Sequence, residues 1–224
     1  MLQVAKKQYA VIGLGRFGSS VSKYLAEMGF EVLAVDESAQ RVQDVANKVT
    51  HAVTADSTDE EAMTSLGIRN FDVVVVAIGQ DIQASILTTL ILKDLGVPYI
   101  IAKAQSELHG KVLNKIGADK VVFPERDMGL RVAHHLISPN ILEHIELSAD
   151  YSIVELVIPS FIIGKNLKQL DFRTKYHCNV LAVKRDDELN ITPSPDEPLH
   201  EKDILVIVGK NELLTKLEQA YGES

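Results

Sequence analysis

The feature that most constrains the fold is a glycine-rich turn between an apolar strand and an amphipathic helix. The turn spans residues 13–18, reads Gly-Leu-Gly-Arg-Phe-Gly, and matches G-x-G-x-x-G. Residues 9–12 before it predict a buried strand, and the apolar residues of 21–28 after it share one helix face. A second apolar run, 31–35, ends in Asp36. With an acid about 20 residues beyond the glycines, the motif predicts a Rossmann-type unit that binds phosphates.

Each glycine of this turn has its own mechanical role. Gly13 allows the tight turn, Gly15 lets the backbone approach a phosphate, and Gly18 lets the helix pack on the strand. The free N–H groups of the helix N-terminus favour anions. Asp36 can accept hydrogen bonds from ribose hydroxyls and repels a 2′-phosphate, so NADP is expected to bind worst. The alternative is a glycine-rich turn that binds nothing.

Residues 1–126 repeat a strand–helix unit. Alternating strands and helices predict a doubly wound α/β domain with a parallel sheet and helices on both faces. The run 73–78 has no polar alternation, which indicates a central strand buried on both faces. Strands are expected at 9–12, 31–35, 51–55, 72–78, 99–102 and 120–123.

Residues 127–146 are expected to form a helical crossover segment that contributes to dimerisation. A helix over 127–137, a break at Ser138-Pro139 and a short helix over 139–146 fit the serine N-cap and the proline that follows it. The apolar residues of this segment lie on more than one side, which favours burial. These apolar residues are buried either against the rest of the same chain or against a second subunit.

The pattern changes again in residues 147–224, which predict a small α+β domain. Strands are expected at 152–158, 180–184 and 204–208, and helices at 166–176 and 211–221, with a hairpin connection at 185–190. A domain this small is expected to need a dimer to complete its core.

Composition excludes several classes of protein. The net charge of −8 over 224 residues argues against non-specific nucleic-acid binding and against docking to anionic lipid. Cys178 is the only cysteine, so no intrachain disulfide forms, which fits a reducing cytoplasm. The start has no apolar signal-peptide core, and no apolar run approaches the ~18 residues of a membrane span.

Polar residues gather where the predicted parallel strands end, which is where such sheets bind ligands. Asp56 and Ser57 are placed to contact the base or ribose. Lys103 offers a cation to phosphates or an ion pair to Glu125. Each residue alone has an ordinary alternative as a helix cap or a solvated loop charge. The histidines show no metal spacing, and no acid–base pair for a hydride acceptor stands out, so the chain is interpreted as a nucleotide sensor and not an enzyme.

Several segments resemble the RCK (KTN) family, the cytosolic regulatory subunits of Ktr-type potassium transporters. The resemblance rests on residues 10–18, 34–36, 75–97, 115–129, 175–185 and 203–209, and it covers nearly the whole chain. It implies ATP or ADP binding, with NAD(H) also reported, and octameric rings on the inner face of the membrane beneath a potassium-translocating subunit. It implies a nucleotide site lined by Arg16, Asp36, Glu37, Ser38, Asp56, Ser57, Ile78, Gly79, Gln80, Lys103, Ala104, Gln105, His109 and Glu125, beside Gly13, Gly15, Phe17 and Gly18 of the glycine loop.

Some members of this family bind cyclic di-AMP between two C-terminal domains. Arg173, Lys175 and Asn179 are the candidates here for the phosphates, and Leu167, Val180 and Pro195 for the adenines. The alternative is a plain dimer surface.

Two residues of the nucleotide site have specific expected roles. Arg16 is expected to meet a γ-phosphate, and Glu125 to act with Mg²⁺ or Ca²⁺ unless it pairs with Lys103 or Arg126. The leading hypothesis is a nucleotide-binding gating subunit without catalysis. The alternatives are an NAD-dependent dehydrogenase of a small hydroxy acid and a free NAD(H) sensor.

Overall fold

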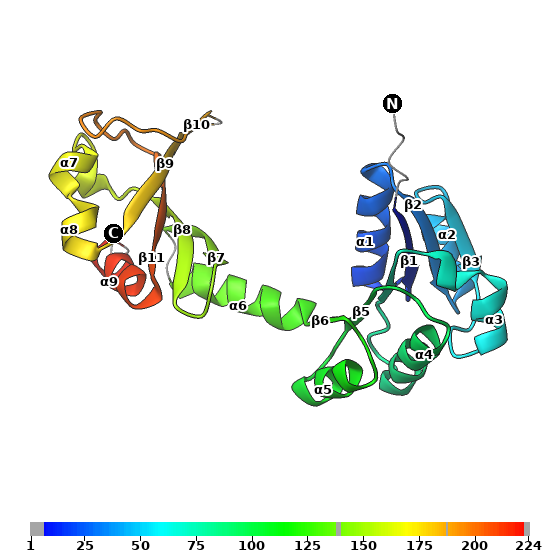
Figure 1. Ribbon diagram of the computed structural model, residues 1–224. Coiled ribbons are helices and arrows are strands. Elements are labelled where there is room, and N and C mark those ends of the chain that lie inside the picture. The colour runs from blue at the N-terminus through cyan, green and yellow to red at the C-terminus, as the bar shows by residue number, and fades with distance from the viewer. Residues whose placement is uncertain (1–6, 138–139, 187, 222–224) are drawn as a thin grey trace, which may run out of the picture. The chain divides into compact units, whose positions relative to one another are not determined.

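The computed structural model describes residues 7–137, 140–186 and 188–221. The chain divides into two compact units, residues 1–126 and 127–224 (Figure 1). The boundary falls near the start of helix α6 (Pro124–Ile137), so this helix begins in the first unit and continues in the second.

The first unit is built on a six-stranded parallel sheet of order β3-β2-β1-β4-β5-β6. The order reverses beside β1, which creates the switch point at which open α/β sheets bind ligands. The strands are β1 (Gln8–Ile12), β2 (Glu31–Asp36), β3 (His51–Thr54), β4 (Val73–Val76), β5 (Ile100–Lys103) and β6 (Lys120–Val122). The central β4 lies between β1 and β5, and three of its valines are buried, as its uninterrupted apolar run predicts.

Helices cover both faces of this sheet. On one face, α1 (Arg16–Glu27) and α2 (Ala39–Ala46) pack against strand residues such as Val11 and Ala34. On the other face, the main core joins Ile12, Val35 and Val76 to Met63, Leu92 and Leu113. These last three come from α3 (Glu60–Ser65), α4 (Ile82–Asp94) and α5 (Glu107–Lys115), and a short 3₁₀ helix, Ile68–Asn70, follows α3. The predicted Rossmann-type fold is confirmed.

The second unit contains an antiparallel sheet of order β10-β9-β11-β8-β7. Its strands are β7 (Ile141–Glu146), β8 (Tyr151–Val157), β9 (Asn179–Arg185), β10 (Glu188–Asn190) and β11 (Ile204–Lys210). A 3₁₀ turn, Ser160–Ile162, precedes the helices α7 (Leu167–Leu170), α8 (Phe172–Tyr176) and α9 (Asn211–Tyr221). One core joins Leu156, Leu205 and Ile207 of the sheet to Phe172 and Leu217 of the helices, as an α+β domain requires.

The helix predicted over 139–146 is wrong, because residues 141–146 form strand β7. Ile141 is buried opposite Leu156, and Ile145 lies opposite Ile153 in the antiparallel ladder with β8. The spacing of Ile141, Leu142 and Ile145 suits a helix as well as a strand, so the pairing with β8 decides between them. The break predicted at Ser138-Pro139 lies outside the described residues. No helix in the described part of the chain is long and apolar enough to span a membrane.

Candidate nucleotide site

A cavity of about 1010 Å³ opens at the carboxyl ends of the strands in the first unit, where the strand order reverses. That volume lies at the upper end of small-molecule sites, about 300–1,000 Å³. The cavity is lined by Ile12, Gly13, Leu14, Gly15, Arg16, Phe17, Ser19, Asp36, Glu37, Arg41, Ala55, Asp56, Ser57, Ala77, Ile78, Gly79, Gln80, Asp81, Ala84, Lys103, Gln105 and Glu125.

The three glycines of the loop differ in what a side chain would meet. Gly13 has φ +92°, and a Cβ there would lie 2.9 Å from the Ile78 nitrogen. A Cβ at Gly18 would lie 1.9 Å from the Gly13 carbonyl oxygen, so helix α1 requires glycine for its close approach. Gly15 is different, because its φ is −65° and a Cβ would meet nothing within 4 Å. The fold tolerates a side chain at residue 15, so glycine there serves to keep space open above the loop.

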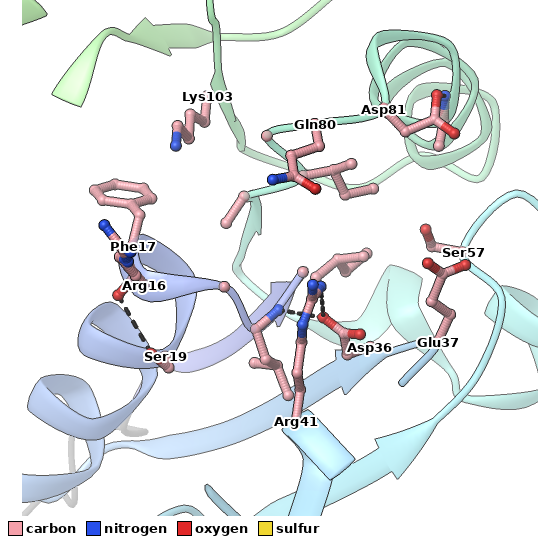
Figure 2. A pocket seen from close by; sticks show the side chains of 18 of the residues that line it. Arg16, Phe17, Ser19, Asp36, Glu37, Arg41, Ser57, Gln80, Asp81 and Lys103 are labelled. Carbon is pink, nitrogen blue, oxygen red and sulfur yellow. Dashed lines mark hydrogen bonds and ion pairs between the residues drawn. The ribbon is translucent and has the colours of Figure 1, made fainter. Parts of the chain in front are cut away.

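Asp36, at the end of β2, accepts hydrogen bonds from the glycine loop and from the start of α2. Its Oδ2 accepts the Leu14 N–H at 2.6 Å, and its Oδ1 accepts the Ser38 N–H at 2.8 Å. The Arg41 guanidinium lies 3.5 Å from the same Oδ2 (Figure 2). The Asp36 side chain is 3% exposed, so its charge is held by these three partners. One carboxylate therefore joins the glycine loop to the start of α2.

Cationic and aromatic groups gather on one side of the cavity. Figure 2 shows Arg16, Phe17 and Lys103 there, with Glu37, Ser57 and Asp81 on the other side. The buried Lys103 ammonium lies 5.9 Å from the centre of the Phe17 ring and pairs with Glu125. The hydrogen bond from Lys103 lowers the pKa of Glu125, so Glu125 is an anion at neutral pH. The Lys103–Glu125 ion pair, which the sequence analysis gave as an alternative for Glu125, is therefore present.

Asp56 and Ser57 already form hydrogen bonds with other residues of the chain. Asp56 accepts hydrogen bonds from the hydroxyl and the N–H of Thr58, which lower its pKa. The buried Ser57 hydroxyl lies 2.8 Å from that of Thr88 on α4. Both residues line the cavity, but their local bonds match the ordinary alternative of a turn residue and a packed hydroxyl.

Four predicted site residues do not line the cavity: Gly18, Ser38, Ala104 and His109. Gly18 and Ser38 act through packing and through the bond to Asp36. His109 is buried, its Nδ1 accepts the Gln105 N–H, and its Nε2 has no hydrogen-bond partner among the residues that the structure describes. Burial lowers the pKa of His109, so its imidazole is neutral at pH 7.

Sequence reasoning missed Arg41 and Asp81. Asp81 caps α4 by accepting the Ala84 N–H, and an aspartate directly before an apolar helix was the available signal. Arg41 lies next to Val42, in the first turns of the helix that follows β2, which places it at the same sheet edge as Asp36.

The side chains around Glu125 do not form a metal site by themselves. Across the described ranges, no three His, Cys, Asp or Glu side chains gather so as to hold a metal ion. A cation beside Glu125 would therefore take most of its ligands from phosphate oxygens and water.

The second unit brings some of the cyclic di-AMP candidates together. Arg173 donates from Nε to Asn179 Oδ1 at 2.9 Å, and Lys168 N–H donates to the Pro195 carbonyl, next to Leu167. Lys175 is exposed and Val180 packs against the core. A second cavity, of about 370 Å³, is lined by Leu167 together with residues that the sequence did not single out, namely Val183, Arg185, Glu188, Leu189, Asn190, Pro193, Ser194, Glu197, Pro198 and Leu199.

Family comparison matches both units. The TrkA-N domain matches residues 9–124, and the TrkA-C domain matches residues 152–222. The chain belongs to the RCK family of TrkA-N and TrkA-C proteins. The resemblance seen in the sequence is confirmed.

Two Bacillus subtilis (strain 168) proteins are among the RCK relatives of this chain. Ktr system potassium uptake protein C is 51% identical over 96% of this chain and 97% of its own length. Ktr system potassium uptake protein A is 48% identical over 97% of this chain and 98% of its own length. A solved structure of the GsuK channel bound to NAD matches the whole chain and 41% of its own length, with a TM-score of 0.67 and 19% identity. That likeness shows the shared fold.

Proposed function

We propose that this RCK protein is an adenine-nucleotide-binding regulatory subunit of a membrane potassium transporter. The relatives that share about half of its residues are Ktr potassium uptake proteins, and they match it over almost their whole length. The observation that carries nucleotide binding is the open space above Gly15, beside a cavity large enough for a nucleotide. ATP, ADP and NAD(H) are the candidate ligands.

The residues present fit an adenine nucleotide. Phosphates would lie over the N-terminus of α1, whose first N–H groups have no partner within the helix. Arg16 and Lys103 line that side, and the ribose and base would lie toward Asp36 and Asp56. The bound nucleotide supplies no chemistry in this proposal; it stabilises one shape of the protein over another.

Regulation requires that two nucleotides favour different shapes. A ligand with equal affinity for both states shifts nothing, so ATP and ADP must differ in what they contact. Arg16 is exposed and lines the cavity beside the glycine loop, which supports the proposal that it meets the γ-phosphate and distinguishes ATP from ADP.

Assembly of several copies, up to an octameric ring on the inner face of the membrane, belongs to the same proposal. Met128, Leu130, Val132, Leu136 and Ile137 of α6 are between 52% and 80% exposed. Apolar residues on more than one side of a helix favour burial against another surface, so the segment 127–146 is proposed to contribute to dimerisation. Mass determination with and without nucleotide tests the assembly.

Cyclic di-AMP at the second unit is a further candidate ligand. The Arg173–Asn179 hydrogen bond places an exposed guanidinium beside an exposed amide, and arginine forms strong, often bidentate pairs with phosphate. Calorimetry of the full chain tests it with Arg173→Ala, and Lys216→Ala on α9 as the control. Absence of heat from the wild type at high micromolar cyclic di-AMP would rule out this ligand and leave a plain dimer surface.

Two experiments test the main proposal. Calorimetric titration with ATP, ADP and NADH should show one site per chain, and potassium flux into vesicles containing a Ktr-type membrane subunit should depend on which nucleotide is bound. NADH oxidation by a 2-keto acid would instead support the dehydrogenase alternative. Nucleotide binding without any effect on flux would favour a free NAD(H) sensor.

A Mg²⁺ or Ca²⁺ ion between Glu125 and the phosphates is part of the proposal for ATP.

A further inference from the structure

Arg41 lies beside Asp36, the carboxylate at the position that contacts ribose in Rossmann sites. It lies on α2, lines the nucleotide cavity, and has a side chain that is 52% exposed. Its Nη1 is 3.5 Å from Asp36 Oδ2. Figure 2 shows its guanidinium reaching over Asp36 toward the cavity.

Asp36 itself presents little of its charge to a ligand. Leu14 and Ser38 each donate a backbone N–H to one of its oxygens, and the side chain is 3% exposed. The accessible charged groups at this end of β2 are therefore Arg41 and the exposed Glu37, and Arg41 is the cation of the two.

Rossmann sites select the ribose 2′-position with these two kinds of group. An acid accepts hydrogen bonds from the 2′-hydroxyl, whereas a nearby arginine accommodates a 2′-phosphate. A guanidinium carries five N–H donors in a planar fork that suits phosphate oxygens, and the pair with Asp36 engages a part of that fork. Glu37 is exposed on the same cavity and opposes a second negative charge, so the balance between the two ligand classes should be close.

We propose that Arg41 makes this pocket accept adenine nucleotides with a 2′-phosphate, such as NADPH, alongside those with a free 2′-hydroxyl. The inference rests on the proposed nucleotide site and names a ligand class for it. It differs from the sequence-based expectation that Asp36 makes NADP the weakest ligand, because the Arg41 guanidinium offsets the charge of Asp36.

Fluorescence titration of the full chain with NADH and NADPH tests the proposal, with ADP as a reference. The wild type should bind NADPH within about tenfold of NADH. Arg41→Ala should weaken NADPH at least about tenfold more than NADH, because a hydrogen bond to a charged group contributes about that much. Arg41→Lys should restore part of the difference, since lysine keeps the charge and lacks the fork.

Lys48→Ala is the matched control, because Lys48 is an exposed cation just beyond α2 and does not line the cavity. It should leave the NADPH/NADH ratio unchanged. Equal losses of NADH and NADPH in Arg41→Ala would overturn the inference, as would wild-type NADPH binding more than a hundredfold weaker than NADH. If neither NADH nor ADP binds to the wild type, the nucleotide site and this inference both fall.

Discussion

The Asp36 carboxylate accepts the Leu14 N–H at 2.6 Å and thereby ties the glycine loop to the end of β2. The bond crosses 22 positions in the sequence and is buried. The residue expected to hold a ribose thus also fixes the loop that would hold the phosphates, and ligand binding and local stability depend on one side chain.

Asp36→Ala is therefore expected to have two effects. It should weaken ATP and NAD together by about 1–3 kcal/mol. It should also lower the free energy of unfolding by about 1–3 kcal/mol, because the buried Leu14 N–H and the partly buried Ser38 N–H lose their acceptor. Calorimetry measures the nucleotide affinities, and urea unfolding measures the free energy of unfolding. Asp44→Ala, which removes an exposed acid on the neighbouring helix α2, is the control. Unchanged affinity for both nucleotides would refute the ribose assignment.

Arg16 is expected to distinguish ATP from ADP. Within the described ranges it forms no ion pair, so its fixed positive charge is available to a ligand or to a neighbouring subunit's nucleotide. Arg16→Ala should weaken ATP at least about tenfold more than ADP, as loss of a hydrogen bond to a charged group predicts. Arg16→Lys should rescue only part of the loss. Equal losses would show that Arg16 contacts the shared phosphates, and its gating role would have to be dropped.

Glu125 is expected to exchange its Lys103 partner for a bound cation when ATP is present. Without a cation, a carboxylate on the cavity wall would repel the phosphates. ATP affinity of the wild type should fall when a chelator removes Mg²⁺ and Ca²⁺, and Glu125→Gln should respond less. Calorimetry with and without chelator measures this. Indifference to the chelator in both proteins would leave Glu125 as a plain ion-pair partner.

The ion pair between Asp203 and Arg185 is expected to stabilise the second unit. Asp203 is fully buried and accepts from Arg185 Nε at 2.8 Å, from Nη2 at 2.9 Å and from the His200 N–H. Asp203→Asn should cost about 2–3 kcal/mol of unfolding free energy, whereas Glu197→Gln, at an exposed contact of the same arginine, should cost under about 1 kcal/mol. Equal effects of the two variants would show that the buried ion pair stabilises the second unit no more than the exposed contact does.

The stabilisation that Asp203 provides is expected to decrease at low pH. Burial alone would raise the pKa of Asp203, but the hydrogen bonds from Arg185 and His200 bring it below the ordinary value of 3.8. A carboxyl with a lowered pKa stabilises the fold fully above its unfolded value, and this contribution is lost as the pH falls through the folded pKa. The stability difference between wild type and Asp203→Asn should therefore shrink below about pH 4 in urea titrations.

The sequence predicted the glycine loop, Asp36 and the parallel sheet because each depends on local pattern. Gly13 and Gly18 have positions that only glycine fits, and periodicity shows where the strands end. Arg41 and Asp203 could not be found in this way, since their roles come from contacts with Asp36 and Arg185 that only the folded chain creates. Strand β7 was missed for the same reason, because Ile141 and Ile145 suit either structure until β8 pairs with them.

The nucleotide site is tested most directly at Gly15, where a Cβ would meet nothing within 4 Å in the folded chain. Gly15→Ala should keep the ligand-free stability within about 1 kcal/mol, the scale of an N-cap change, while filling the space that a phosphate needs. Gly129→Ala, where a Cβ also meets nothing within 4 Å, is the matched control. Calorimetric titration with ADP should show tight binding to the wild type and to Gly129→Ala, and at least about tenfold weaker binding to Gly15→Ala. Equal ADP affinity in all three proteins would contradict a phosphate site above this loop.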